Sequence, residues 1–108
     1  MSGIDDRRKG MEAKLHHDDE LRFKVHNRRN KLLGLWAAEQ FGLTGDEAAE
    51  YAKQVVMSDF EETGDEDVLR KVLADFNSRG VKVEQETLRE KMDALLEVAH
   101  DQIVGEAG

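Results

Sequence analysis

The chain has 108 residues, a length typical of one domain with a single core, and it contains neither cysteine nor proline. The lack of cysteine excludes disulfides, thiolate zinc sites and cysteine nucleophiles. Hydrophobic residues make up 39% and charged residues 37%, and the abundance of Ala, Glu, Lys, Leu and Arg favours helices, so the expected fold class is all-α. The longest apolar run, Leu32 to Ala38, is too short to span a bilayer, and no secretory signal is recognisable at the start. We therefore expect a cytoplasmic protein without direct membrane insertion.

The charge is distributed unevenly along the chain. Residues 1–31 hold nine Lys and Arg against six Asp and Glu, a net +3, whereas residues 32–108 hold seven against eighteen, a net −11. A body this acidic repels phosphates, which argues against nucleic acid as a partner. A basic arm on an acidic body suggests either a protein partner with an acidic cleft or an arm attracted to its own body.

Residues 1–19 are predicted to form a flexible N-terminal arm, disordered or partly helical when the protein is free. Ile4, Met11 and Leu15 fall on one helical face, at i, i+7 and i+11, among mainly charged neighbours. Three apolar contacts over about four turns cannot offset a backbone ordering cost of roughly 1–2 kcal/mol per residue. The arm is nevertheless amphipathic enough to fold against the groove of a partner.

Residues 20–108 are predicted to form a compact four-helix bundle. The first helix runs from about Asp18 to Phe41, and three more apolar stripes follow helical spacing. These stripes comprise Ala48, Ala52, Val55, Val56 and Phe60; Val68, Leu69, Val72, Leu73 and Phe76; and Leu88, Met92, Leu95, Ala99 and Ile103. Because the loops between them are short, neighbouring helices are expected to be antiparallel.

Helix ends are marked by recognisable residues. Three glycines suit the left-handed position just after a helix: Gly42, Gly64 and Gly80. Thr44 with Glu47 three residues later is typical of a capping box, and Asp65 is a suitable N-cap. The fourth helix begins less clearly, near Val83 or Glu84.

The strongest local cationic cluster consists of Arg28, Arg29 and Lys31. One interpretation is a helix whose first half is solvated and whose second half, with Trp36, enters the core. The alternative is that the three cations hold an anion. Gly34 costs about 1 kcal/mol relative to alanine inside a helix, so we expect it to permit the close approach of another helix.

Histidines and carboxylates give only weak indications of a site. Glu97 and His100 have the Glu-x-x-His spacing of di-iron bundles, but no second copy exists, so no metal site is predicted. His16 and Glu20, at i and i+4, could form only a weak, open metal site. A solvated helix start is the favoured interpretation of His16 and His17, with a pH switch as an open alternative. No nucleophile elbow or glycine-rich phosphate loop is present, so we predict no catalytic residue and no enzyme activity.

The stretch Arg28 to Glu39, which reads RRNKLLGLWAAE, resembles the hallmark of the alphaproteobacterial F1-ATPase zeta subunits. Shorter segments share the resemblance almost throughout the chain: Glu12-Ala13-Lys14 followed by His17-Asp18, Leu43-Thr44-Gly45, Tyr51-Ala52-Lys53, and Asp59-Phe60-Glu61 to Gly64-Asp65-Glu66-Asp67-Val68. The resemblance implies a four-helix bundle that binds the F1 sector of ATP synthase, peripheral to the inner membrane, and blocks ATP hydrolysis.

The resemblance also implies a mechanism for residues 2–19. In the family, the N-terminal segment becomes helical as it wedges into a catalytic interface between alpha and beta subunits and reaches the gamma subunit. Here Ile4, Met11 and Leu15 would supply apolar anchors. Four cations would pair with acidic side chains of the partner: Arg7, Arg8, Lys9 and Lys14.

The family is further associated with ADP and ATP, which would act as regulatory ligands rather than required cofactors. Arg28, Arg29 and Lys31 are the residues that this implication would place at the nucleotide. The free protein is expected to be a monomer. Two alternatives to inhibition remain: a helical adaptor, and a nucleotide-sensing bundle, in either of which the arm folds onto another protein partner.

Overall fold

The computed structural model describes the backbone of residues 2–60 and 65–107 and the side chains of residues 20–59 and 65–106. Five elements follow one another along this part of the chain: α1 (Ser2–Gln40), α2 (Gly45–Met57), a single 3-10 turn η1 (Ser58–Phe60), α3 (Glu66–Ser78) and α4 (Gln85–Ala107). No strand occurs within the described ranges, and the all-α prediction is confirmed. None of the described helices combines the length and the apolar character needed to cross a membrane.

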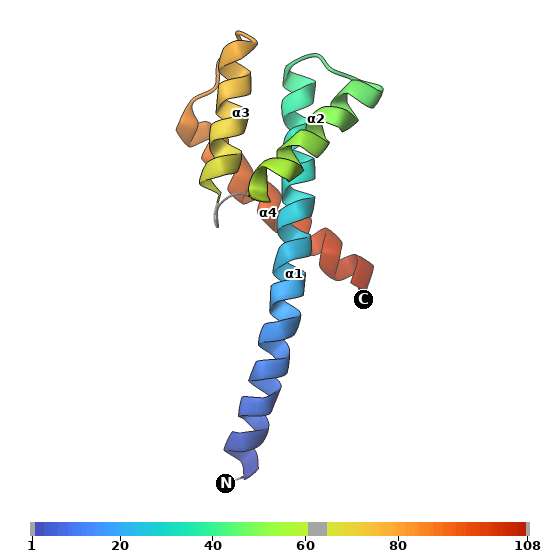
Figure 1. Cartoon of the computed structure of the whole chain (residues 1–108), viewed down its shortest axis with the longest axis vertical. Coiled ribbons are helices and arrows are strands. Elements are labelled where there is room, and N and C mark those ends of the chain that lie inside the picture. The colour runs from blue at the N-terminus through green and yellow to red at the C-terminus, as the bar shows by residue number, and fades with distance from the viewer. Residues whose placement is uncertain (1, 61–64, 108) are drawn as a thin grey trace.

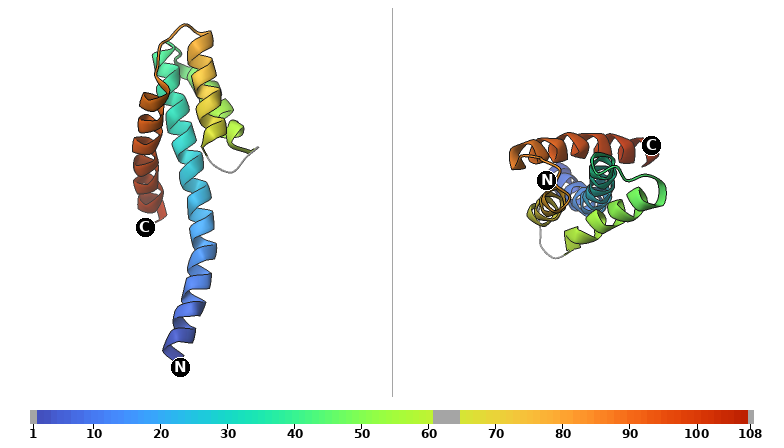
Figure 2. Two further views of the ribbon diagram at one scale, coloured as in Figure 1. Left: turned by 90° about the vertical axis from the view of Figure 1, so that its left-hand side faces the viewer. Right: turned by 90° about the horizontal axis from the view of Figure 1, so that it is seen from above.

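Helix α1 is the spine of the molecule (Figure 1). Its C-terminal half lies between α2 and α4, and α3 packs beside them to complete the four-helix bundle (Figure 2). Its N-terminal half projects past the other helices, so the molecule measures 62 × 25 × 22 Å. A four-helix bundle with an N-terminal extension is therefore confirmed.

Helix α1 extends farther toward the N-terminus than the first helix predicted from the sequence. It begins at Ser2 rather than near Asp18, and it passes residues 19 and 20 without a break. The physical reason is local: no proline interrupts residues 2–19, and Arg, Lys, Glu, Met and Leu are all good helix formers. Disorder of these residues in the free protein stays a prediction.

The core lies where the four helices meet. Its main cluster of buried residues comprises Leu33, Ala37, Ala38, Tyr51, Val55, Val68, Leu69, Val72, Phe76, Leu88 and Met92. Trp36 packs against this cluster, as predicted, with its ring 5.7 Å from that of Phe76. A second cluster of Val25, Ala99 and Ile103 joins α1 to α4 farther down the bundle. Nearly every apolar stripe position predicted for α3 and α4 is buried. The side chain of Phe60, which was predicted to extend the stripe of α2, lies outside the described residues.

Gly34 is the point of closest approach between α1 and α2. A Cβ atom built at this position would lie 2.5 Å from the Cα of Ala52, which is closer than two non-bonded carbon atoms approach in proteins. The prediction that Gly34 admits another helix is therefore confirmed, and α2 is the helix that it admits.

The predicted C-terminal glycine caps of α1 and α3 are confirmed. Gly42 has φ 78°, and the N–H of Leu43 donates to the carbonyl of Ala38 at 2.8 Å. Gly80 has φ 72°, and the N–H of Val81 donates to the carbonyl of Phe76 at 3.0 Å. These bonds satisfy carbonyl groups that would otherwise lack a partner at the helix ends. The third candidate, Gly64, lies outside the described residues.

The predicted N-cap positions are confirmed, since Thr44 precedes α2 and Asp65 precedes α3, but neither side chain makes the expected capping bond. Thr44 has the extended backbone of an N-cap, but its hydroxyl makes no capping bond, and Gly45 after it takes φ 57°. Asp65 precedes α3 but has helical backbone angles and makes no capping bond. Its carboxylate is occupied by Arg29 instead.

Candidate functional site

The predicted arm residues all belong to the projecting half of α1 (Figure 1). They are Ile4, Arg7, Arg8, Lys9, Met11, Lys14 and Leu15, and their side chains lie outside the described residues. Alternating steps of seven and four residues define one face of the continuous helix: Ile4, Met11, Leu15, Arg22, His26, Leu33 and Ala37. Among the described residues of this face, Leu33 and Ala37 have no exposed surface, His26 is half-buried and Arg22 is exposed.

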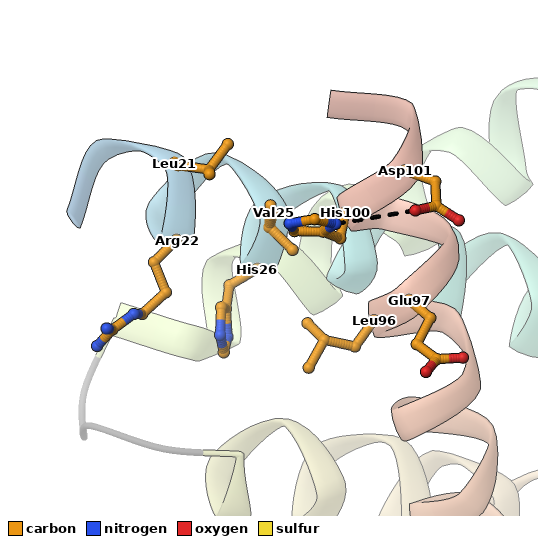
Figure 3. A pocket seen from close by; sticks show the side chains of 8 residues that line it. All are labelled: Leu21, Arg22, Val25, His26, Leu96, Glu97, His100 and Asp101. Carbon is orange, nitrogen blue, oxygen red and sulfur yellow. Dashed lines mark ion pairs between the residues drawn. The ribbon is translucent and has the colours of Figure 1, made fainter. Parts of the chain in front are cut away.

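An open groove of about 660 Å³ lies between α1 and α4 at the point where α1 leaves the bundle (Figure 3). Its lining residues are Leu21, Arg22, Val25 and His26 from α1, and Leu96, Glu97, His100 and Asp101 from α4. The floor is apolar, because Val25 is buried and Leu21 and Leu96 are half-buried. The two sides differ in charge, with Arg22 on α1 and Glu97 and Asp101 on α4. The groove can therefore hold an amphipathic group that carries both charge signs.

The structure does not bring Arg28, Arg29 and Lys31 together. Arg28 lies against α4, where its guanidinium donates to Gln102 at 2.9 Å and pairs with Glu106 at 2.8 Å. Arg29 is fully buried, and Lys31 is exposed to solvent. The three cations therefore do not converge on one anion in this conformation, and nucleotide binding at them stays a prediction.

Arg29 is instead the centre of a buried polar network. Its Nε donates to Asn30 Oδ1 at 2.7 Å, and its Nη2 donates to Asp65 Oδ1 at 2.6 Å. Asn30, also fully buried, donates from Nδ2 to Asp59 Oδ2 at 3.0 Å. Asp59 and Asp65 stand on either side of residues 60–64. Helix α1 therefore holds the chain both before and after that segment.

The charge of this network is balanced mainly at Asp65. Burial by itself would raise the pKa of Asp65, but the hydrogen bond and positive charge of Arg29 outweigh it. His26, with Nδ1 at 3.9 Å from Asp65 Oδ1, and Arg89 act in the same direction, so the pKa of Asp65 lies below its ordinary value of 3.8. Asp65 is therefore ionised at neutral pH and compensates the buried guanidinium.

A second polar contact joins α2 to α3. The hydroxyl of the buried Tyr51 donates to Asp75 Oδ2 at 2.8 Å, and Lys71 pairs with the same oxygen at 2.9 Å. Burial, followed by the contact with Asp75, raises the pKa of Tyr51 far above its ordinary value of 10.0. The phenol therefore stays protonated and acts as a structural donor.

The histidines lie apart from any cluster of metal ligands in the described part of the chain. His100 is exposed, and its Nδ1 is 3.8 Å from Asp101 Oδ1 (Figure 3). Among the described residues, no group of three or more His, Asp or Glu side chains is placed to hold a metal ion. The side chains of His16 and His17 lie outside those residues, so their role as a pH switch stays a prediction.

The sequence analysis missed the groove and the buried network. The network had a detectable signal, because Arg29 stands four residues before Leu33 and eight before Ala37, on the core face of a helix. Its partners Asp59 and Asp65 are far away in sequence, so nothing local identified them. The groove depends on where α4 crosses α1, which apolar spacing does not specify.

Comparisons with known proteins support a single assignment over most of the chain. The model of a family described as ATPase inhibitor subunit zeta matches residues 1–102. A solved structure, determined by solution NMR, is 48% identical in sequence, with a TM-score of 0.71 over 80% of this chain and 98% of that one. No curated protein matches the chain. The family match includes both the projecting half of α1 and the bundle.

Proposed function

The chain belongs to the family of ATPase inhibitor zeta subunits, and from this we propose that it blocks ATP hydrolysis by the F1 sector of ATP synthase through its N-terminal segment. In this proposal, residues 2–19 insert as a helix at a catalytic interface between alpha and beta subunits and reach gamma. The observation that carries the proposal is the projection of this half of α1 beyond the bundle (Figure 1). The protein then acts as a regulator and needs no chemistry of its own.

The inhibition follows from conformational preference. Hydrolysis requires the catalytic interface to open and close as the rotor turns, and an inserted helix favours one conformation of that interface. The binding energy of the helix therefore opposes the next rotary step. The bundle keeps the segment near its target once either part has bound, which raises the effective concentration of the other.

The residues of the segment divide into two roles. Ile4, Met11 and Leu15 share one helical face and provide apolar anchors. Arg7, Arg8, Lys9 and Lys14 pair with acidic side chains of the partner. The bundle itself carries a net negative charge, so the cations concentrated in the first 31 residues direct this end of the molecule toward an acidic surface.

Deletion of Ser2 to His17 tests the proposal. The shortened protein should lose inhibition of purified F1, while its thermal unfolding transition stays nearly unchanged, because the buried core begins at Val25. Full inhibition by the shortened protein at wild-type concentrations would place the inhibitory surface on the bundle and contradict the proposal. Recovery from native membranes of a partner other than the alpha and beta subunits would favour the helical adaptor instead.

Adenine nucleotide binding near Arg28, Arg29 and Lys31 remains a separate proposal. Arg29 is already engaged in the buried network, so of the three cations only Arg28 and Lys31 have exposed surface to offer. A titration with millimolar ADP that leaves the chemical shifts of residues 28–31 unchanged would remove it.

A further inference from the structure

We propose that the groove between α1 and α4 is a second contact surface for F1 and receives an amphipathic helix of that partner. The bound helix places apolar side chains over Leu21 and Leu96, a carboxylate toward Arg22 and a cation toward Glu97. This inference rests on the proposed function, because it takes F1 as the partner that holds the N-terminal segment.

The first argument is the continuity of one helix face. The stripe that contains Met11 and Leu15 reaches Arg22 and His26 by the same steps of seven and four residues and then enters the core at Leu33. Arg22 and His26 both line the groove. A partner that packs along the projecting half of α1 therefore meets the groove next, before the bundle covers this face.

The second argument is the composition of the groove. Its apolar floor is formed where Leu21 and Leu96 pack against the small cluster that joins α1 to α4, and both side chains are only half-buried. Helices in contact lie about 8–10 Å apart, and their side chains meet every three or four residues. The groove between α1 and α4 offers three apolar side chains for such contacts, Leu21, Val25 and Leu96 (Figure 3).

The third argument is charge. Arg22 is exposed and makes no hydrogen bond or ion pair with another residue whose side chain the structure describes, and the same holds for Glu97 across the groove. These two charges have opposite signs and flank an apolar floor. An amphipathic helix with one acidic and one basic flank complements this pattern, whereas a uniformly charged segment would be repelled on one side.

Paired charge reversals test the surface with the full-length protein and purified F1. Arg22→Glu should raise the concentration needed for half-maximal inhibition of ATP hydrolysis at least tenfold. Lys24→Glu is the matched control, since it makes the same charge change two residues away on the outer face of α1, and it should have less than a twofold effect. Glu97→Lys should weaken inhibition likewise, and Glu90→Lys, seven residues earlier on α4, should not.

All four substituted side chains are exposed, so the thermal unfolding of the free variants should match that of the wild type. Equal effects of Arg22→Glu and Lys24→Glu would mean that only the net charge of this end of α1 matters for inhibition. That result would overturn the proposal of a helix bound in the groove. Wild-type protein without any inhibitory activity would instead overturn the proposed function, so the two failures are distinguishable.

Cross-linking gives a second readout that does not depend on inhibition strength. Because the chain has no cysteine, His100→Cys introduces a single thiol in the groove, to which a short photoreactive cross-linker can be attached. This variant should cross-link to an F1 subunit in the inhibited complex. Lys53→Cys, on the exposed side of α2, is the control. Cross-linking from position 100 no stronger than from position 53 would contradict a helix seated in the groove.

Discussion

The two halves of α1 are one continuous helix, yet they obtain stability in different ways. Residues 20–40 place Val25, Leu33, Ala37 and Ala38 in the core, where burial against α2, α3 and α4 stabilises the helix. Residues 2–19 extend beyond those helices and contain only three apolar residues on the corresponding face (Figure 1). Helical backbone geometry is therefore shared, whereas the tertiary contacts that maintain it are not.

In the proposed function, this one helix face serves two purposes. Within residues 20–40 it packs against the rest of the chain, and within residues 2–19 it contacts F1. Arg22 and His26 stand at the transition, as two polar positions between the apolar residues Leu15 and Leu33. Substitutions of residues 2–19 on this face should therefore affect inhibition and leave folding intact, whereas substitutions of its buried residues, such as Leu33 and Ala37, should impair folding.

The largest expected effect comes from residues 2–19. Met11→Asp together with Leu15→Asp would leave two carboxylates desolvated in the complex, at a cost of at least several kcal/mol. A loss of even 3 kcal/mol weakens binding about a hundredfold. The concentration needed for half-maximal inhibition of F1 should rise by at least that factor.

Ala13→Asp is the matched control for this pair. Position 13 lies on the opposite face of the helix, nine residues after Ile4, so it should change inhibition little. The thermal unfolding of both variants should match the wild type. If Ala13→Asp weakened inhibition as much as the Met11→Asp and Leu15→Asp pair, the two faces of the segment would not differ in their contact with F1.

For the half of α1 within the bundle, the largest loss of stability should come from Asp65→Ala, because Asp65 is the ion-pair partner of Arg29 on that helix. The substitution removes the carboxylate that compensates the fully buried Arg29 and leaves an uncompensated charge in the bundle. Breaking such a pair costs about 3 kcal/mol, measurable as a lower midpoint of urea unfolding. Asp93→Ala, at an exposed site on α4, should change stability by less than about 0.5 kcal/mol. An unchanged midpoint for Asp65→Ala would mean that solvent, rather than Asp65, compensates Arg29.

Gly34→Ala tests the contact between α1 and α2 with a single methyl group. Alanine gains about 1 kcal/mol in helix propensity, but its Cβ would lie 2.5 Å from the backbone of Ala52, and overpacking costs about 1–3 kcal/mol. The net result should be a loss of stability. Gly105→Ala is the matched control, because nothing lies within 4 Å of its Cβ, and it should be neutral or stabilising. If Gly34→Ala stabilised the protein, α2 would have to move away from α1 at no cost in the free energy of unfolding.

The fold was predictable from sequence because its signals are local. Apolar spacing identified the four helices, and Gly42 and Gly80 identified two helix ends, because helix periodicity and left-handed caps depend on neighbouring residues. Asp65 occupies the predicted N-cap position of α3, but its side chain binds Arg29, and this partner was not predictable because it is distant in sequence. The groove was not predictable for the same reason. It depends on the crossing of α1 and α4, which only the assembled bundle defines.

The smallest expected effect is the pH dependence of the Arg29–Asp65 pair. The pKa of Asp65 is lowered in the folded protein, so the folded state binds a proton less readily than the unfolded chain, whose aspartates titrate near 3.9. The stabilisation that ionised Asp65 gives to the folded protein is therefore complete above about pH 4. It is lost as the pH falls through the pKa that Asp65 has in the folded protein. Urea unfolding of wild type and Asp65→Asn between pH 3 and pH 7 measures it. The wild-type advantage should be constant from pH 5 to 7 and shrink toward pH 3, whereas Asp93→Asn should show a much smaller change with pH. An advantage that grows on acidification would reverse the sign and mean that burial, rather than Arg29, dominates the ionisation of Asp65.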